Sequence, residues 1–142
     1  MSVVFPDGTV VRGTGLDRRE ANASWRSFGL YLDARWQPTW PATVVEWEDF
    51  GLPHCPTRAA RAIQDAFARA VSGEHVEVGC AGGFGRTGTV LACMAVLAGV
   101  PTDAAVAWVR THYRPAAVET SDQEVWVHWF AAQILGDERQ QS

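Results

Sequence analysis

Residues 75–98 read HVEVGCAGGFGRTGTVLACMAVLA, and this stretch contains three different local patterns. HVEVG alternates as a β-strand does, and TVLACMAVLA is apolar on every side, which predicts a buried helix. Between them lie a cysteine, several glycines and the pair Arg86-Thr87, which predict a tight loop. A strand, a tight loop and a helix in this order are a typical unit of an α/β fold.

The flanking sequence predicts further strands before this stretch and helices on both sides of it. Turn residues and β-branched or aromatic runs predict a hairpin over 2–13 and strands over 28–32 and 43–47. A short polar helix is expected over 17–23. Apolar residues at helical spacing predict helices over 56–72, 102–113 and 120–135. Strands dominate the first half and helices the second, so we expect an α/β sandwich.

The length and composition limit the class of protein. A chain of 142 residues suits one core, so we expect a single domain, 1–142, with a short frayed tail at about 137–142. A net charge of −4 gives no general attraction to nucleic acid or to an anionic membrane. All 12 basic residues are arginine, which excludes Schiff-base catalysis and the lysine of nucleotide-binding loops. The three cysteines form no metal or disulfide pattern. No apolar run approaches the ~20 residues of a membrane span. We therefore expect a cytoplasmic protein, and we expect it to be a monomer.

The glycines of the loop indicate an anion site. Glycine at this density costs backbone entropy, and it lets successive N–H groups turn inward around a negative group. A helix begins directly behind the loop, and its N-terminus favours phosphate or a related oxyanion. The segment GFGRTG (83–88) also fits the dinucleotide pattern G-x-G-x-x-G, but another helix follows where that fold needs a second strand. We therefore expect a phosphate site and reject a dinucleotide site.

Cys80 and Arg86 are separated by five residues and carry complementary chemistry. An isolated cysteine on an apolar strand would be an inert buried thiol. A thiol beneath a helix N-terminus and beside an arginine is instead activated as a nucleophilic thiolate. Arg86 can bind two oxygens of a phosphoryl group in one fork, and Thr87 can donate its hydroxyl to the sulfur. These residues predict nucleophilic catalysis of phosphoryl transfer.

The segment CAGGFGRTG (80–88) resembles the signature loop of the cysteine-based protein tyrosine and dual-specificity phosphatases. The family pattern is H-C-x-x-G-x-x-R-[S/T], and Gly79 stands where the family has histidine. The resemblance implies a three-layer α/β sandwich in which helices flank a central, mixed and mostly parallel sheet. The catalytic residues matched in the loop are Cys80, Arg86 and Thr87, and the phosphate would be bound by Ala81, Gly82, Gly83, Phe84, Gly85 and Arg86.

Residues 47–53, WEDFGLP, resemble the mobile lid of the same family, which reads W-P-D-F-G-x-P. A departing alkoxide or phenoxide needs an acid to protonate it. The resemblance gives this catalytic role to Asp49 rather than to the adjacent Glu48. Because Glu48 replaces the proline of the lid, we expect a less restricted hinge. A sulfurtransferase, which shares the cysteine-to-arginine loop, needs no such acid.

Residues 119–123, ETSDQ, resemble the Q-T-x-x-Q loop with which tyrosine-specific members position the hydrolytic water. Gln123 matches this pattern and Glu119 does not. The same stretch has the form of a capping box, in which Thr120 and Gln123 begin a helix. A water-positioning role and a plain helix cap therefore both stay open for Gln123.

Together, the motifs imply a phosphomonoester hydrolase that works through a phosphocysteine intermediate without a metal or other cofactor. It would be a protein-tyrosine or dual-specificity phosphatase, and its partner would be a phosphorylated protein or a small phosphomonoester. No side chain between Cys80 and Arg86 is positively charged, which favours a singly phosphorylated substrate. Gly79 and Glu119 depart from the family pattern, so the alternative is a pseudophosphatase that binds phosphate or phosphoprotein with weak or no catalysis.

Overall fold

A five-stranded sheet forms the centre of the computed structural model, which describes residues 1–141. Its strands are β1 (Ser2–Val4), β2 (Val10–Gly15), β3 (Phe28–Tyr31), β4 (Ala42–Val44) and β5 (Val76–Cys80). They lie in the order β1-β2-β5-β3-β4, with β1 antiparallel to β2 and the other neighbouring pairs parallel. The expected mixed, mostly parallel sheet is confirmed.

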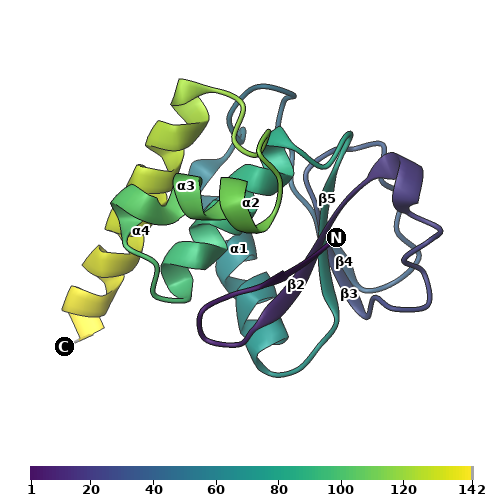
Figure 1. Ribbon diagram of the computed structural model, residues 1–142, viewed down its shortest axis with the longest axis horizontal. Helices are drawn as coiled ribbons and strands as arrows, with labels where there is room; N and C mark the ends of the chain where they lie inside the picture. Colours follow the sequence, from purple (N-terminus) through teal and green to yellow (C-terminus); the bar gives the residue numbers. More distant parts are fainter. Residues whose placement is uncertain (142) are drawn as a thin grey trace.

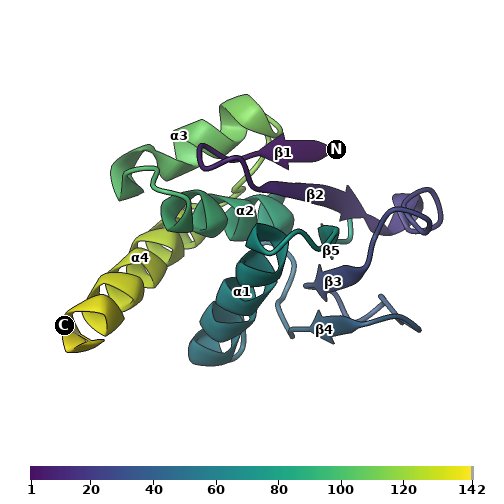
Figure 2. The ribbon, with the colours of Figure 1, turned by 90° about the horizontal axis from the view of Figure 1, so that it is seen from below.

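The α-helices of the described chain lie on one side of this sheet (Figures 1 and 2). They are α1 (Pro56–Val71), α2 (Gly85–Leu97), α3 (Thr102–His112) and α4 (Ser121–Gln141). The other side is covered by the short 3-10 helix η1 (Leu16–Arg18) and by the loops before and after β3 (Figure 2). The expected α/β sandwich is confirmed, and its layer opposite the α-helices consists of η1 and loops.

The helices form where the apolar spacing predicts them. α1 begins with Pro56 in its first turn, buries Ile63 and Phe67 on one face, and ends just before Gly73, whose φ is 101°. α2 contacts β5, α1, α3 and α4, so it is covered on all sides. This position explains why almost every residue of α2 is apolar or small.

The two faces of β5 serve different layers, because successive side chains of a strand point to opposite sides. Val76, Val78 and Cys80 belong to the apolar core on the helical side. Glu77 and Gly79 face the loop side, where the Glu77 carboxylate accepts a hydrogen bond from the Tyr31 hydroxyl. Cys80 and Gly79 are therefore adjacent in sequence but lie on opposite faces of the sheet, Cys80 on the helical side and Gly79 on the loop side.

Three elements differ from the sequence-based expectation by more than two residues. The strand expected over 43–47 ends at Val44, because the following residues lead into a loop closed by a β-bridge between Trp47 and Pro53. The helix expected over 17–23 is reduced to η1 and a series of turns. α4 extends to Gln141, past the expected end at 135, and the frayed tail expected at about 137–142 falls on residues whose side chains, with all of Ser142, lie outside the described part of the chain. Among the described helices, none is both long and apolar enough to span a bilayer.

Candidate active site

Cys80 ends β5 at the carboxyl edge of the sheet, and its side chain is buried beneath the loop that leads into α2. Its sulfur accepts hydrogen bonds from the Gly83 backbone N–H at 3.2 Å and from the Thr87 hydroxyl at 3.0 Å. Gly83 adopts φ +81°, and a Cβ there would lie 2.9 Å from the Thr14 carbonyl, so only glycine suits this turn. The loop thus surrounds the Cys80 sulfur with hydrogen-bond donors.

The loop residues expected to bind phosphate occupy distinct positions. Gly82, Phe84 and Gly85 line a pocket of about 150 Å³ together with Cys80. Ala81 does not line it, and its carbonyl accepts a hydrogen bond of 3.0 Å from the Leu16 N–H. The N-terminus of α2, which starts at Gly85, is directed at this pocket and contributes a partial positive charge.

Arg86 is buried in the first turn of α2, and its guanidinium is held by three carbonyl or carboxylate groups. Nη1 donates to the carbonyls of Leu32 at 2.9 Å and Trp47 at 2.8 Å, and Nη2 donates to Asp33 Oδ2 at 3.0 Å. The buried Nε has no hydrogen-bond partner in the described chain. This N–H is therefore available to donate a hydrogen bond to an anionic ligand.

Asp49 lies on the loop 47–53, whose residues Asp49 and Phe50 line the pocket of Cys80. Trp47 Nε1 donates to the Gly51 carbonyl at 2.8 Å, and the Gly51 N–H donates to the Glu48 carbonyl at 2.9 Å. Asp49 Oδ1 lies 3.6 Å from Arg86 Nη2, and Asp49 lines the same 150 Å³ pocket as Cys80. The structure therefore places Thr87 and Asp49 at Cys80, while Arg86 lines a second pocket, of about 340 Å³, that Asp49 also lines.

Gln123 does not line the pocket of Cys80. Its buried side-chain oxygen accepts hydrogen bonds from the N–H groups of Glu119 at 2.8 Å and Thr120 at 3.3 Å, and its amide nitrogen donates to the Gly51 carbonyl at 3.1 Å. These partners agree with the helix-cap interpretation and add a contact to the lid. Glu119 lines the pocket in its place, and a Cβ on Gly85 would overlap its carboxylate.

Three residues beyond the expected catalytic and phosphate-binding set support the site from outside the pocket. Tyr113 donates its hydroxyl to the Gly83 carbonyl at 2.6 Å, and burial raises the pKa of Tyr113 to about 12. Trp36 Nε1 donates to the Cys80 carbonyl at 3.1 Å. Asp33 binds Arg86 and also Arg35, and the hydrogen bonds from Arg35 hold the pKa of Asp33 well below its ordinary value.

Of these three, Asp33 carried a usable signal in the sequence. It comes directly after a predicted strand, and the carboxyl ends of parallel strands meet at one edge of a sheet. An acidic residue at that edge is a natural partner for the arginine of the loop. Neither Tyr113 nor Trp36 carries a comparable local signal.

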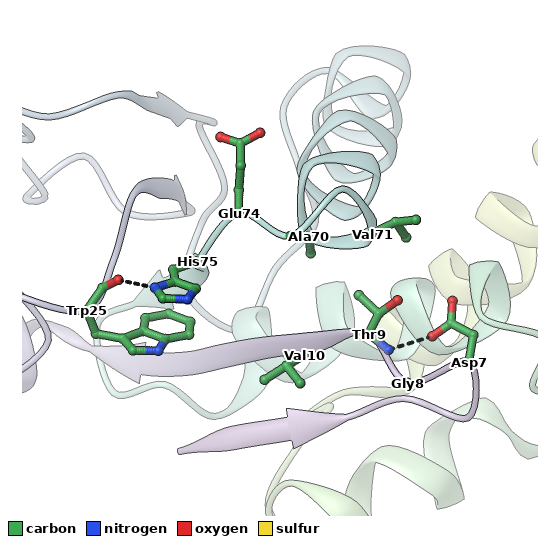
Figure 3. Close-up of a pocket in the computed structure, with 10 residues that line it drawn as sticks. Asp7, Gly8, Thr9, Val10, Trp25, Ala70, Val71, Glu74 and His75 are labelled. Atoms are coloured by element: carbon green, nitrogen blue, oxygen red, sulfur yellow. Dashed lines mark hydrogen bonds between the residues drawn. The ribbon is translucent and has the colours of Figure 1, made fainter.

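A cavity of about 570 Å³, drawn in Figure 3, lies beside the residues that precede β2 and β5, whereas Cys80 ends β5. The turn 7–10, the end of α1 and the stacked rings of Trp25 and His75 line it. None of the residues expected in the site reaches this cavity. Within the described residues, no group of three or more His, Cys, Asp or Glu side chains is arranged to hold a metal ion.

Comparison with known proteins connects this arrangement to one family. The family model described as protein-tyrosine phosphatase matches residues 14–133. The uncharacterized protein MJECL20 of Methanocaldococcus jannaschii is 39% identical over 109 residues, which cover 69% of this chain and 71% of the relative. A second uncharacterized protein of that organism, MJ0215, is 38% identical over 109 residues, covering 69% and 66%. The chain therefore spans about two thirds of the length of these relatives.

Solved structures share the fold at lower sequence identity. Tk-PTP in its active form superposes with a TM-score of 0.74 at 22% identity, covering 92% of this chain and 97% of that one. A kinase-associated phosphatase whose catalytic cysteine is replaced by serine gives 0.73 at 13% identity, covering 95% and 96%. Human DUSP28 gives 0.72 at 15% identity, covering 96% and 99%.

Proposed function

This chain belongs to the protein-tyrosine phosphatase family, and on that premise we propose that it hydrolyses phosphomonoesters through a phosphocysteine intermediate. One observation carries the proposal: the Cys80 sulfur accepts two hydrogen bonds in a pocket that Asp49 also lines. A nucleophile and a carboxyl group that face one small pocket can act on the two sides of the same phosphorus.

In the first step, the Cys80 thiolate attacks phosphorus and forms an S–P bond while the P–O bond to the leaving group breaks. Asp49, protonated, donates its proton to the departing oxygen. In the second step, water attacks the phosphocysteine and the Asp49 carboxylate accepts a proton from it. The S–P bond breaks, Thr87 donates a hydrogen bond to the leaving sulfur, and inorganic phosphate is released.

Arg86 supplies the positive charge for both transition states. Its Nη atoms are fixed by Leu32, Trp47 and Asp33, so the guanidinium is oriented before substrate binds. The unpartnered Nε and the N-terminus of α2 provide donors for the phosphoryl oxygens. Such preorganised donors stabilise the transition state more than mobile donors do, because they need no reorientation during the reaction.

We also propose that the substrate is a singly phosphorylated aryl ester such as phosphotyrosine in a protein. Loop residues 81–85 contribute no cationic side chain for a second phosphate. Phe50 and Phe84 both line the pocket and are exposed, which gives its mouth two apolar walls. An aromatic leaving group would bury its ring against these walls.

A phosphoprotein-binding module with weak or no turnover is the second candidate. Two observations favour it: Gly79 replaces the histidine of the family pattern, and the Glu119 carboxylate lies at the pocket, where it repels an anion. The candidate differs from the first in one measurable respect, because it binds a phosphopeptide without releasing phosphate.

Turnover of phenyl phosphate and of a phosphotyrosine peptide, with EDTA present, tests the proposal. Cys80→Ser should abolish phosphate release, and Asp49→Asn should lower kcat for phenyl phosphate by about 100-fold to 10,000-fold. Cys55→Ser changes an exposed cysteine that does not line the pocket of Cys80 and should behave like wild type. Undiminished turnover by Cys80→Ser would refute the mechanism, and peptide binding without turnover by wild type would establish the binding module.

A further inference from the structure

Gly79 lacks the side chain that the family pattern places before the cysteine, and another residue fills its space. A Cβ built on Gly79 would lie 2.8 Å from Cζ2 of Trp36 and 3.2 Å from the Tyr31 ring. Trp36 comes from the loop after β3 and is buried. The indole therefore occupies the volume into which a histidine at position 79 would project.

The Trp36 indole also makes a polar contact with the catalytic loop. Its Nε1–H donates a hydrogen bond of 3.1 Å to the carbonyl of Cys80, from the face of the sheet opposite the sulfur. The next carbonyl, that of Ala81, is held by the Leu16 N–H at 3.0 Å. Both carbonyls at the exit of β5 are thus fixed on the loop side, away from the pocket.

The position of the indole is itself tightly fixed. Its ring stacks on Tyr31 with the ring centroids 4.1 Å apart, and the Trp36 backbone N–H donates to the Asp33 carbonyl at 3.1 Å. Tyr31 is held in turn by hydrogen bonds to Glu77 and from Trp40 Nε1, the latter at 2.8 Å. A donor that is immobilised by packing loses little entropy when it holds the loop.

We propose that Trp36 positions the Cys80 loop in place of the missing histidine. By binding the Cys80 carbonyl, the indole N–H fixes the direction in which the chain leaves β5, so that the Gly83 N–H meets the sulfur. Trp36 is a positioning residue, since it contacts neither the sulfur nor the pocket. This inference rests on the proposed function for its catalytic meaning, but its effect on the thiol is measurable without turnover.

The direct test replaces Trp36 by phenylalanine, which retains an aromatic ring against Tyr31 and removes the N–H donor. The matched control is Trp40→Phe, which removes an indole donor to Tyr31 and leaves the Cys80 carbonyl untouched. Both variants are made in a Cys55→Ser background, because Cys55 is the exposed cysteine. Burial raises the pKa of the Cys93 thiol, so Cys80 is then the thiol that reacts.

The readout is the rate of iodoacetamide alkylation of Cys80 between pH 5 and 8, with kcat and KM for phenyl phosphate measured beside it. The charged residues that line the pocket, Asp49 and Glu119, and Arg86, which lies 3.6 Å from Asp49, are the same in every variant. Trp36→Phe should slow alkylation at the acidic end and lower kcat, each by about fivefold, the effect of one hydrogen bond. Its KM should stay within about twofold, and Trp40→Phe, which keeps the Trp36 N–H on the Cys80 carbonyl, should change the alkylation rate and kcat less than Trp36→Phe does.

A reciprocal pair of variants tests the shared space. Gly79→His alone should destabilise the protein, since the imidazole and the indole compete for one volume. In a Trp36→Ala background, Gly79→His should instead restore alkylation at acidic pH relative to Trp36→Ala. Equal alkylation profiles for Trp36→Phe and the background, or no restoration in the double variant, would overturn the inference. A wild type that alkylates as expected but releases no phosphate would refute only the proposed function.

Discussion

The side-chain amide of Gln123, at the start of α4, donates a hydrogen bond of 3.1 Å to the carbonyl of Gly51 in the lid. The same carbonyl accepts from Trp47 Nε1 at 2.8 Å. Two donors from separate parts of the chain thus converge on one lid oxygen. Gln123 and Gly51 are 72 residues apart in sequence, and their hydrogen bond connects the helix cap to the loop that carries Asp49.

Gln123→Ala should therefore impair the lid rather than the hydrolytic water. The variant leaves the N–H groups of Glu119 and Thr120 without an acceptor and removes one of the two donors to the Gly51 carbonyl, which should cost about 1–3 kcal/mol of unfolding free energy. kcat should fall more for phenyl phosphate than for p-nitrophenyl phosphate, because only the poorer leaving group depends on Asp49. Gln133→Ala, on an exposed part of α4, is the control. A burst of phosphocysteine formation followed by slow turnover would contradict this and establish the water-positioning role.

Asp33→Asn should reduce both the stability of the protein and the effectiveness of Arg86. The contacts of Asp33 with Arg35 and Arg86 lower its pKa, so its carboxylate stabilises the fold fully above ~4, the ordinary value in an unfolded chain. At pH 7 we expect a loss of about 2 kcal/mol, which shrinks as the pH falls below ~4 toward the lowered value. kcat should fall by up to about 100-fold as the guanidinium shifts.

The control for Asp33 is Asp65→Asn, which breaks an exposed pair with Arg69. Such surface pairs contribute little, so this change should cost under about 0.5 kcal/mol and leave kcat unaltered. Urea unfolding at pH 7 and pH 3 and steady-state kinetics compare the two variants. A wild-type kcat in Asp33→Asn would show that Leu32 and Trp47 suffice to orient Arg86.

Tyr113→Phe should weaken the loop from the side of α3 with little change in packing. The phenyl ring still fills the space beside Gly13, and only the hydrogen bond of the hydroxyl to the Gly83 carbonyl is lost. We expect a loss of about 1 kcal/mol and a modest fall in kcat. The raised pKa of about 12 means that the phenol stabilises the fold fully below ~10 and loses this effect as the pH rises toward 12. Thermal unfolding should therefore show the same difference between the proteins throughout pH 5–9; a difference that changed within that range would contradict the assignment.

Gly83→Ala should damage the site more than its backbone angle alone explains. Gly83 and Gly73 both have positive φ, +81° and +101°, so alanine at either position costs about 1–2 kcal/mol of strain. Gly73 faces open space, whereas a Cβ on Gly83 would lie 2.9 Å from the Thr14 carbonyl. Gly83→Ala should therefore lose more stability than Gly73→Ala and should also lose activity as its N–H moves from the Cys80 sulfur. Equal unfolding free energies with wild-type kcat in both would refute this role.

The elements of the fold were predictable because their signals are local. The apolar spacing after Pro56, the alternation before Cys80 and the glycine run after it each define an element without reference to distant residues. The strand expected over 43–47 was too long, because an apolar run continues past the point where pairing with β3 ends. Secondary structure depends on the available partner strand as well as on the side chains.

The candidate site was predictable only in part. Cys80, Arg86 and Thr87 stand within one short segment, so a motif can identify them. The contacts of Trp36 with Cys80 and of Asp33 with Arg86 span 44 and 53 residues and arise from the parallel pairing of β3 with β5. The order of strands in a sheet has no local signature, and these supporting residues therefore had to be read from the structure.

Direct detection of the phosphocysteine tests the central claim that Cys80 receives the phosphoryl group. Asp49→Asn is mixed with p-nitrophenyl phosphate, whose leaving group needs no acid, quenched within milliseconds to seconds, digested and analysed by mass spectrometry. Loss of Asp49 as the base should slow the second step, so we predict a burst of nitrophenol and a phosphoryl group on Cys80, approaching one per chain. A variant that turns over with no phosphate on Cys80, or with the label on another residue, would contradict the proposed mechanism.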